Sequence, residues 1–293
     1  MDVSVVVIAY NERGYIGKCI SSILAQTYKR FELVIVDDGS TDGTVREIKA
    51  FQDPRIRLFR KRQNSGYSYA RNTGIENSNG EIIFFTDADC VVAKDWIEQG
   101  LKVFKKNKDI AGVTGRTYYV SKSYRPSIRD RYRGYLKPET YATRNIAYYK
   151  SELQEAGGFS LRYNYGWEDI ELSVRILKKK RILFSKGMIV YHQKKQFVFN
   201  QMPDFFFRTR SLVYLKKDHP DYRNSSYYFW RICCPAHLLL VIFPPFLPFF
   251  LALQGIRIRK ADELRYLFYI YYWTFRIRLL IWKTALKENV FII

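Results

Sequence analysis

The chain has 293 residues, of which 47% are hydrophobic and 26% are charged. This balance suffices for a packed core and excludes a globally disordered chain. The formal net charge is +21, but residues 1–100 carry −1, residues 101–200 carry +14 and residues 201–293 carry +8. Because the first third is neutral, a uniformly basic nucleic-acid binder is not expected. The basic excess predicts attraction to phosphates, such as those of lipid headgroups.

The first ninety residues alternate between apolar, β-branched runs and helical patterns. Strands are predicted over 3–10, 31–36, 56–59 and 81–86, and helices over about 14–26, 42–51 and 67–77. This order predicts an α/β fold with a doubly wound, mostly parallel sheet.

Polar residues follow three of these strands. They are Tyr10-Asn11-Glu12, Asp37-Asp38 and Asp87-Ala88-Asp89. Because ligands bind at the carboxyl ends of parallel strands, we expect these acidic groups to converge on one edge of the sheet.

The two carboxylates of Asp87-Ala88-Asp89 are one residue apart at a strand end, where both can reach a hard cation. Mg2+ and Mn2+ prefer oxygen ligands and commonly share them with substrate phosphates. The alternative is that these acids are only solvated or capping. The acids after the second strand also have two interpretations. One carboxylate can accept hydrogen bonds from a nucleobase or ribose, or the segment only makes a turn at Gly39 and caps the next helix with Ser40, Thr41 or Asp42.

Beyond residue 110 the alternation becomes irregular. Strands are expected over 111–119, 146–149 and within 182–192, with a helix over 168–179. A change in composition divides the chain into 1–200 and 201–293. The four cysteines, Cys19, Cys90, Cys233 and Cys234, show no metal-binding spacing and are expected to be reduced thiols.

The second region is expected to be helical and associated with a membrane. Residues 232–253 contain no charged side chain and four prolines, and both flanks are basic. This pattern favours a re-entrant hairpin over a full span or an ordinary pair of core helices. A helix over about 264–282 is expected to lie in the membrane interface. With no signal peptide at the start of the sequence, the first region is expected on the cytoplasmic side of the cell membrane.

Several motifs resemble those of glycosyltransferase family 2, over about residues 1–195. The residues that carry the resemblance are Ala9-Tyr10-Asn11-Glu12, Ser22, Gln26-Thr27-Tyr28, 36–42, Asn64-Ser65-Gly66, 70–74, Asp87-Ala88-Asp89, Gly157-Gly158-Phe159 and Trp167-Glu168-Asp169. The resemblance implies a GT-A fold, a nucleotide-diphosphate sugar donor, a divalent metal (Mn2+ or Mg2+) and inversion at the anomeric carbon.

The resemblance also implies roles for individual residues on the donor side. Asp87 would contact ribose or sugar, Ala88 would belong to the nucleotide-sugar site, and Asp89 would bind the metal and diphosphate. Arg71 would lie near the donor or form a structural salt bridge beneath it. The base and ribose would be lined by Ala9, Tyr10, Glu12 and Asp38.

An inverting transfer needs a base on the acceptor side. By resemblance Asp169 is favoured for this role and Glu168 is second, although acids at a helix start also stabilise the helix. Trp167 would stack on an acceptor sugar. An acceptor phosphate would need no strong base, and the acidic pair would then position it. By resemblance His192 would be a metal ligand, and the alternative is a structural histidine.

We therefore expect a metal-dependent inverting glycosyltransferase acting on a membrane acceptor, polyprenyl-phosphate or a lipid-linked saccharide. The basic segments would attract anionic lipids, and no nucleic-acid partner is expected. Two alternatives stay open. One is a transferase for polysaccharide or a diffusible acceptor that is merely anchored at the membrane, and the other is a catalytically silent scaffold that binds nucleotide sugar.

Overall fold

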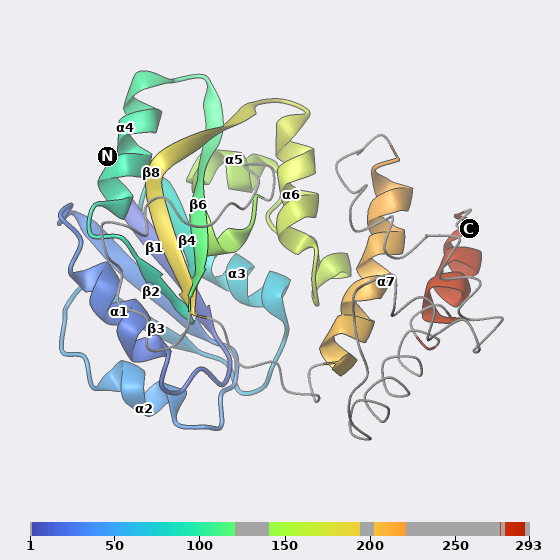
Figure 1. Cartoon of the computed structure of the whole chain (residues 1–293), viewed down its shortest axis with the longest axis horizontal. Coiled ribbons are helices and arrows are strands. Elements are labelled where there is room, and N and C mark those ends of the chain that lie inside the picture. The colour runs from blue at the N-terminus through green and yellow to red at the C-terminus, as the bar shows by residue number, and fades with distance from the viewer. Residues whose placement is uncertain (1, 121–140, 194–201, 221–275, 277–278, 291–293) are drawn as a thin grey trace, which may run out of the picture. The chain divides into compact units, whose positions relative to one another are not determined.

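The computed structural model describes residues 2–120, 141–193, 202–220, 276 and 279–290. The chain divides into two compact units, Met1–Gln196 and Phe197–Ile293. Figure 1 shows the strands in the first of these units.

The first unit is built on one sheet, in which eight strands are described in the order β3-β2-β1-β4-β7-β6-β8-β5. The strands are β1 Val3–Ala9, β2 Phe31–Asp37, β3 Ile56–Arg60, β4 Ile82–Asp87, β5 Cys90–Val92, β6 Ile110–Val120, β7 Ile146–Tyr149 and β8 Arg181–Gln193.

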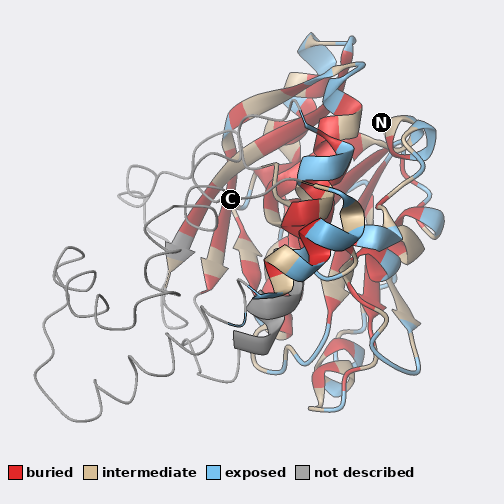
Figure 2. Ribbon diagram, turned by 90° about the vertical axis from the view of Figure 1, so that its right-hand side faces the viewer, coloured by how far each residue is buried: buried red, intermediate tan, exposed pale blue. Residues whose placement is uncertain are grey.

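Helices cover both faces of this sheet, as the alternating pattern predicted (Figure 1). Because successive strand residues point to opposite faces, β1 supplies Val5 to one apolar cluster and Val6 to the other. Figure 2 shows that the strands are mostly buried while the helices expose their outer faces. One cluster contains residues of α1 (Ile16–Leu24), α2 (Thr44–Lys49) and α4 (Trp96–Lys106), and the other contains residues of α3 (Tyr67–Glu76), α5 (Lys150–Glu155) and α6 (Glu168–Leu177).

The prediction of a mostly parallel sheet is correct for β1 to β4 and for the pair of β6 and β8, and wrong for the other pairs. Strands β1, β2, β3 and β4 pair in parallel. Strand β7 is antiparallel to β4 and β6, and β5 is antiparallel to β8, so the sheet is mixed. Strand β5 follows β4 after a two-residue turn but pairs with β8 at the other end of the sheet order.

The convergence of strand ends is confirmed. Ala9 is level with Asp37 across β1 and β2, and Ile8 is level with Asp87 across β1 and β4. The polar clusters after these three strands therefore lie at the same edge of the sheet.

In the second unit, α7 (Met202–Asp218) packs against a helix over 279–288. Val213 is buried with Ile281 and Ala285, and Lys217 Nζ lies 2.8 Å from Glu288 Oε2. The predicted hairpin at 232–253 and most of the predicted helix at 264–282 lie outside the described residues. None of the helices that the structure describes has the length and apolar character to cross a membrane.

Candidate active site

The loop after β1 is tied to the loop after β2. The Asn11 amide donates to Ser40 Oγ at 2.9 Å, and the Glu12 amide donates to Thr44 Oγ1 at 2.7 Å. Tyr10, between strand and loop, is 44% exposed. Its ring is therefore available to a ligand at the edge where the strands end.

Two alanines were also predicted to line the donor site. The side chains of Ala9 and Ala88 are both buried, each 2% exposed. The Ala9 carbonyl already accepts the Asp38 amide at 2.8 Å. The side chains of these alanines therefore lie beneath the surface at this edge of the sheet, and any direct contact with a ligand would be through backbone atoms.

The Asp38 carboxylate holds the loop that leads into α3. It accepts the Ser65 hydroxyl at 2.5 Å, the Ser65 amide at 3.0 Å and the Gly66 amide at 2.9 Å. Asp37 is fully buried and accepts the Ser40 amide. A carboxylate offers about four acceptor positions. Asp38 is 4% exposed and retains capacity for about one further donor, such as a base or ribose group.

His192, which is far from Asp87 and Asp89 in the sequence, lies next to them at the end of β4. Ala88 and Asp89 form the turn between β4 and β5, and β5 pairs with β8 so that Cys90 lies opposite His192. His192 Nε2 is 3.6 Å from Asp89 Oδ1. One ligand atom from each of Asp87, Asp89, Cys90 and His192 lies within 4.8 Å of the others. We call these four residues the edge cluster.

Ser22 and Gln26, which belong to the motifs given above for the family resemblance, hold β5 in this position. Ser22 Oγ accepts the Val92 amide at 3.1 Å. Gln26 donates to the Ala93 carbonyl at 2.7 Å and accepts the Ile97 amide at 3.0 Å. Both Ser22 and Gln26 therefore act through the placement of β5 and α4.

Glu12 interacts electrostatically with the buried Cys19 thiol, as Asp87 and Asp89 do. Burial raises the pKa of the Cys19 thiol well above its ordinary value, and the charges of Asp89, Asp87 and Glu12 raise it further. Cys19 Sγ lies 3.5 Å from the Asp87 carbonyl oxygen. The acid of the loop after β1 and the two acids at the end of β4 thus all act on one buried thiol.

Arg71 links the donor-side and acceptor-side acids. Its guanidinium is buried, hydrogen-bonds to Glu168 through Nη1, and lies 3.7 Å from Asp87 Oδ1 through Nη2. The rings of Tyr67 and Phe159 each lie 5.6 Å from its central carbon. The structural salt bridge is thus present, and the guanidinium also lies beside Asp87, where the resemblance would place the donor.

Electrostatics in this network favour a retained positive charge on Arg71. Burial lowers the pKa of Arg71, but Glu168, Asp87 and Asp169 together raise it above the ordinary value. Burial also raises the pKa of the Glu168 carboxyl, opposed by Arg71 and reinforced by Asp169. One guanidinium therefore faces three acidic side chains and keeps its positive charge.

The two acids at the start of α6, Glu168 and Asp169, have different partners. Trp167 precedes the helix with a φ of 69°, and Glu168 points into the salt bridge with the buried arginine. Asp169 is partly exposed, and its carboxylate accepts the Ile170 amide at 2.8 Å and the Thr143 amide at 3.4 Å. Of the two acids, Asp169 is thus the one with access to a substrate.

Asn164 is a structural residue of the site that the sequence analysis missed. Its Oδ1 accepts the amides of Ser68 and Tyr69 at 3.1 and 3.3 Å, and its Nδ2 donates to the Ser65 carbonyl at 2.5 Å. It caps the start of α3, where the preceding residue Gly66 has no side chain to do so. A helix cap from a residue more than ninety positions away has no sequence pattern that would predict it.

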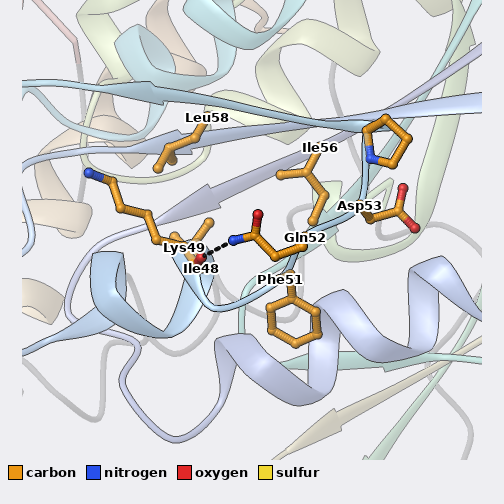
Figure 3. Close-up of a pocket in the computed structure, with 8 residues that line it drawn as sticks. Ile48, Lys49, Phe51, Gln52, Asp53, Ile56 and Leu58 are labelled. Carbon is orange, nitrogen blue, oxygen red and sulfur yellow. Dashed lines mark hydrogen bonds between the residues drawn. The ribbon is translucent and has the colours of Figure 1, made fainter.

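A pocket lies apart from this site, along the edge strand β3 (Figure 3). Two of its polar side chains are already bonded, Gln52 to the Lys49 carbonyl at 3.2 Å and Asp53 to Arg55 at 2.7 Å. Its lining is Ile48, Lys49, Phe51, Gln52, Asp53, Pro54, Ile56 and Leu58. None of the predicted site residues is among them.

The sequence profile of "Glycosyl transferase family 2" matches residues 4–165, more than half of the chain. The chain therefore belongs to glycosyltransferase family 2. The resemblance stated from the motifs is confirmed at this level.

Among curated relatives, "Glycosyltransferase GlyA" of Streptococcus pneumoniae is 32% identical over 223 residues, which is 66% of this chain and 31% of that protein. "Glycosyltransferase AglE" of Haloferax volcanii is 33% identical over 151 residues, or 50% and 49% of the two chains. This chain thus spans half or less of the length of these relatives.

Solved structures show the same fold. S. aureus TarS 1–349 in complex with UDP-GlcNAc has a TM-score of 0.58 and 20% identity, over 73% of this chain and 66% of that one. The mannosyltransferase PcManGT from Pyrobaculum calidifontis, in complex with GDP-Man and Mn2+, has a TM-score of 0.60 and 19% identity, over 98% and 86%. The predicted GT-A-like core is thereby supported, with a mixed sheet where a mostly parallel one was predicted.

Replacing the buried arginine tests the network. Arg71→Met leaves Glu168 and Asp87 without their countercharge, and we expect it to lower the free energy of unfolding by about 3–5 kcal/mol. Urea unfolding followed by circular dichroism measures this loss. The matched control is Arg30→Met, because Arg30 pairs with Asp2 at 2.9 Å while both side chains are more than 70% exposed. Similar losses in the two variants would contradict the role given to Arg71.

Proposed function

We propose that this chain transfers a sugar from a nucleotide-diphosphate sugar to an acceptor, with inversion at the anomeric carbon and with the help of a divalent cation. The observation that carries the proposal is the continuous set of side chains from the edge cluster through Arg71 to the acidic pair of α6. The curated relatives carry the name glycosyltransferase. Related folds are solved with UDP-GlcNAc and with GDP-Man and Mn2+, which supports a nucleotide-sugar donor.

The donor set of the edge cluster fits a divalent cation. Asp89 and His192 would hold it, with Asp87 beside them, because their ligand atoms already lie within 4.8 Å of one another. Two carboxylates suit Mg2+ or Mn2+, and an imidazole favours Mn2+ over Mg2+. When bound, the cation neutralises negative charge on the diphosphate.

The remaining donor contacts fall to the loops after β1 and β2. Tyr10 would stack on the base, Glu12 and Asp38 would accept hydrogen bonds from base or ribose, and Ala9 and Ala88 would form the floor. The exposed ring of Tyr10 and the remaining acceptor capacity of Asp38 support this arrangement.

The chemical step falls to Asp169. Its carboxylate would take the proton of the acceptor hydroxyl as that oxygen bonds to the anomeric carbon, while the bond from that carbon to the diphosphate oxygen breaks. The bonding electrons leave with the nucleoside diphosphate. Glu168 would hold Arg71 in place, and Trp167 would stack on the acceptor. An acceptor that is already an ionised phosphate would need Asp169 only for positioning.

The acceptor is proposed to lie at a membrane, as polyprenyl-phosphate or a lipid-linked saccharide, with the first unit on the cytoplasmic side. The support is in the sequence, namely an uncharged run over 232–253 with basic flanks. Each basic residue near an anionic surface contributes about 1 kcal/mol to membrane attraction. Transfer to polysaccharide or to a diffusible acceptor is the alternative for the same catalytic unit.

Metal dependence is tested at Asp89. Donor hydrolysis is first screened across nucleotide sugars with and without Mn2+, and the active donor is then used. We expect Asp89→Asn, and treatment of the unmodified chain with chelator, to abolish hydrolysis because the cation loses a carboxylate ligand or is removed. The exposed Asp109→Asn is the matched control and should retain activity. Metal-dependent turnover in Asp89→Asn at the control level would rule out the assignment.

The base is tested at Asp169. We expect Asp169→Asn to bind nucleotide with unchanged Kd, measured by calorimetry, and to lose about 10²–10⁴-fold in kcat because an amide cannot accept the proton. Unchanged turnover would move the role to Glu168 or to no residue of the pair.

Membrane attraction is tested by flotation of the full chain with lipid vesicles. We expect it to float with vesicles of phosphatidylcholine and phosphatidylglycerol, less so at high salt, since screening weakens attraction to anionic headgroups. Vesicles of phosphatidylcholine alone, which carry no net charge, are the control and measure the contribution of apolar contacts to membrane binding. Protein that stays at the bottom of the gradient with both lipid mixtures would refute the proposed membrane acceptor.

A further inference from the structure

We infer that Cys90 makes the edge cluster a site for thiophilic divalent cations of the Zn2+, Co2+ and Cd2+ class, with the sulfur as a fourth protein ligand. This inference rests on the proposed function, because it uses the same Asp89 and His192. It goes further in naming a sulfur ligand and a different class of metal.

The strand register places Cys90 beside the other ligands. Cys90 is the direct antiparallel partner of His192 in the β5–β8 pair. Side chains of directly opposed residues lie on the same face of a sheet, with Cβ atoms about 4.5–5.5 Å apart. The contact therefore follows from backbone pairing and does not depend on one rotamer alone.

The distances are close to those of a tetrahedral site. Zinc bonds of about 2.0–2.1 Å to nitrogen or oxygen and about 2.3 Å to sulfur place neighbouring ligand atoms roughly 3.3–3.6 Å apart. In the structure Asp89 Oδ1 is 3.6 Å from His192 Nε2 and 3.9 Å from Cys90 Sγ. All four ligand atoms lie within 4.8 Å of one another, so shifts of about 1 Å or less would bring them around one cation.

Burial distinguishes the two sides of the site. Cys90 is fully buried, whereas the side chains of Asp87 and His192 are 28% and 19% exposed. A cation can therefore approach past Asp87 and His192, with the sulfur closing the inner side. The hydrogen bonds of Ser22 and Gln26 to β5 and its neighbours hold the sulfur in place.

The ligand set has a consequence for the proposed reaction. A thiolate favours Zn2+ and Cd2+ over Mg2+, and binding releases the thiol proton to solvent. Four protein ligands close a tetrahedral shell, which leaves no position for a diphosphate oxygen. Zn2+ is therefore expected to compete with Mn2+ and to inhibit.

The test is optical titration of the full-length protein with Co2+, whose coordination gives a near-ultraviolet charge-transfer band only when sulfur is a ligand. We expect this band in the unmodified chain and in Cys19→Ser, which removes the neighbouring buried thiol outside the cluster. We expect Cys90→Ser to lose the band but keep the visible cobalt absorption. In competition, Cys90→Ser should also weaken Zn2+ binding relative to Mn2+ by about ten-fold or more.

Each outcome decides a different claim. Visible cobalt absorption without the charge-transfer band, or a band that survives in Cys90→Ser, overturns the sulfur ligand and leaves the proposed metal site standing. Cobalt binding that is absent, or equally strong in Asp89→Asn, overturns the metal site itself and the sulfur ligand with it. The unfolding midpoint of each variant is measured, and Cys90→Ala replaces Cys90→Ser if the serine variant does not fold.

Discussion

A single buried guanidinium holds the candidate site together. Arg71 on α3 bonds to Glu168 on α6 and lies beside Asp87 on β4, so three elements meet at one side chain. An uncompensated charge is costly in a buried setting, and each partner therefore constrains the others. The start of α3 is fixed in turn, because Asp38 binds the Gly66 amide immediately before it. The position of the acidic pair relative to the edge cluster depends on this network.

The fold and the chemistry are connected through the strand ends. Parallel strands β1, β2 and β4 bring backbone and carboxylates to one edge, and the turn after β4 sends β5 back against β8. That reversal is what brings His192 to Asp89. Around Arg71, three acids outnumber the one guanidinium. Asp87 lies beside Arg71 and belongs to the edge cluster, so the network joins the acidic pair of α6 to the candidate cation site.

Much of this was predictable from the sequence. Long apolar runs identified β1, β2 and β4, and the polar residues after them met as the parallel topology requires. Strand β5 was missed because three residues after a short turn carry no periodic signal. Cys90 was missed with it, since its neighbour His192 is defined only by strand pairing. The cap supplied by Asn164 depends on tertiary contact alone.

The central claim is that Asp89 and His192 bind one divalent cation next to a nucleotide diphosphate. Crystals grown with Mn2+ and a nucleoside diphosphate, with diffraction measured at the manganese absorption edge, test it most directly. The account predicts an anomalous peak within about 2.0–2.6 Å of Asp89 Oδ1 and His192 Nε2, with diphosphate oxygens on its outer side. A manganese peak elsewhere on the molecule, with nucleotide bound and this edge of the sheet empty, would contradict it.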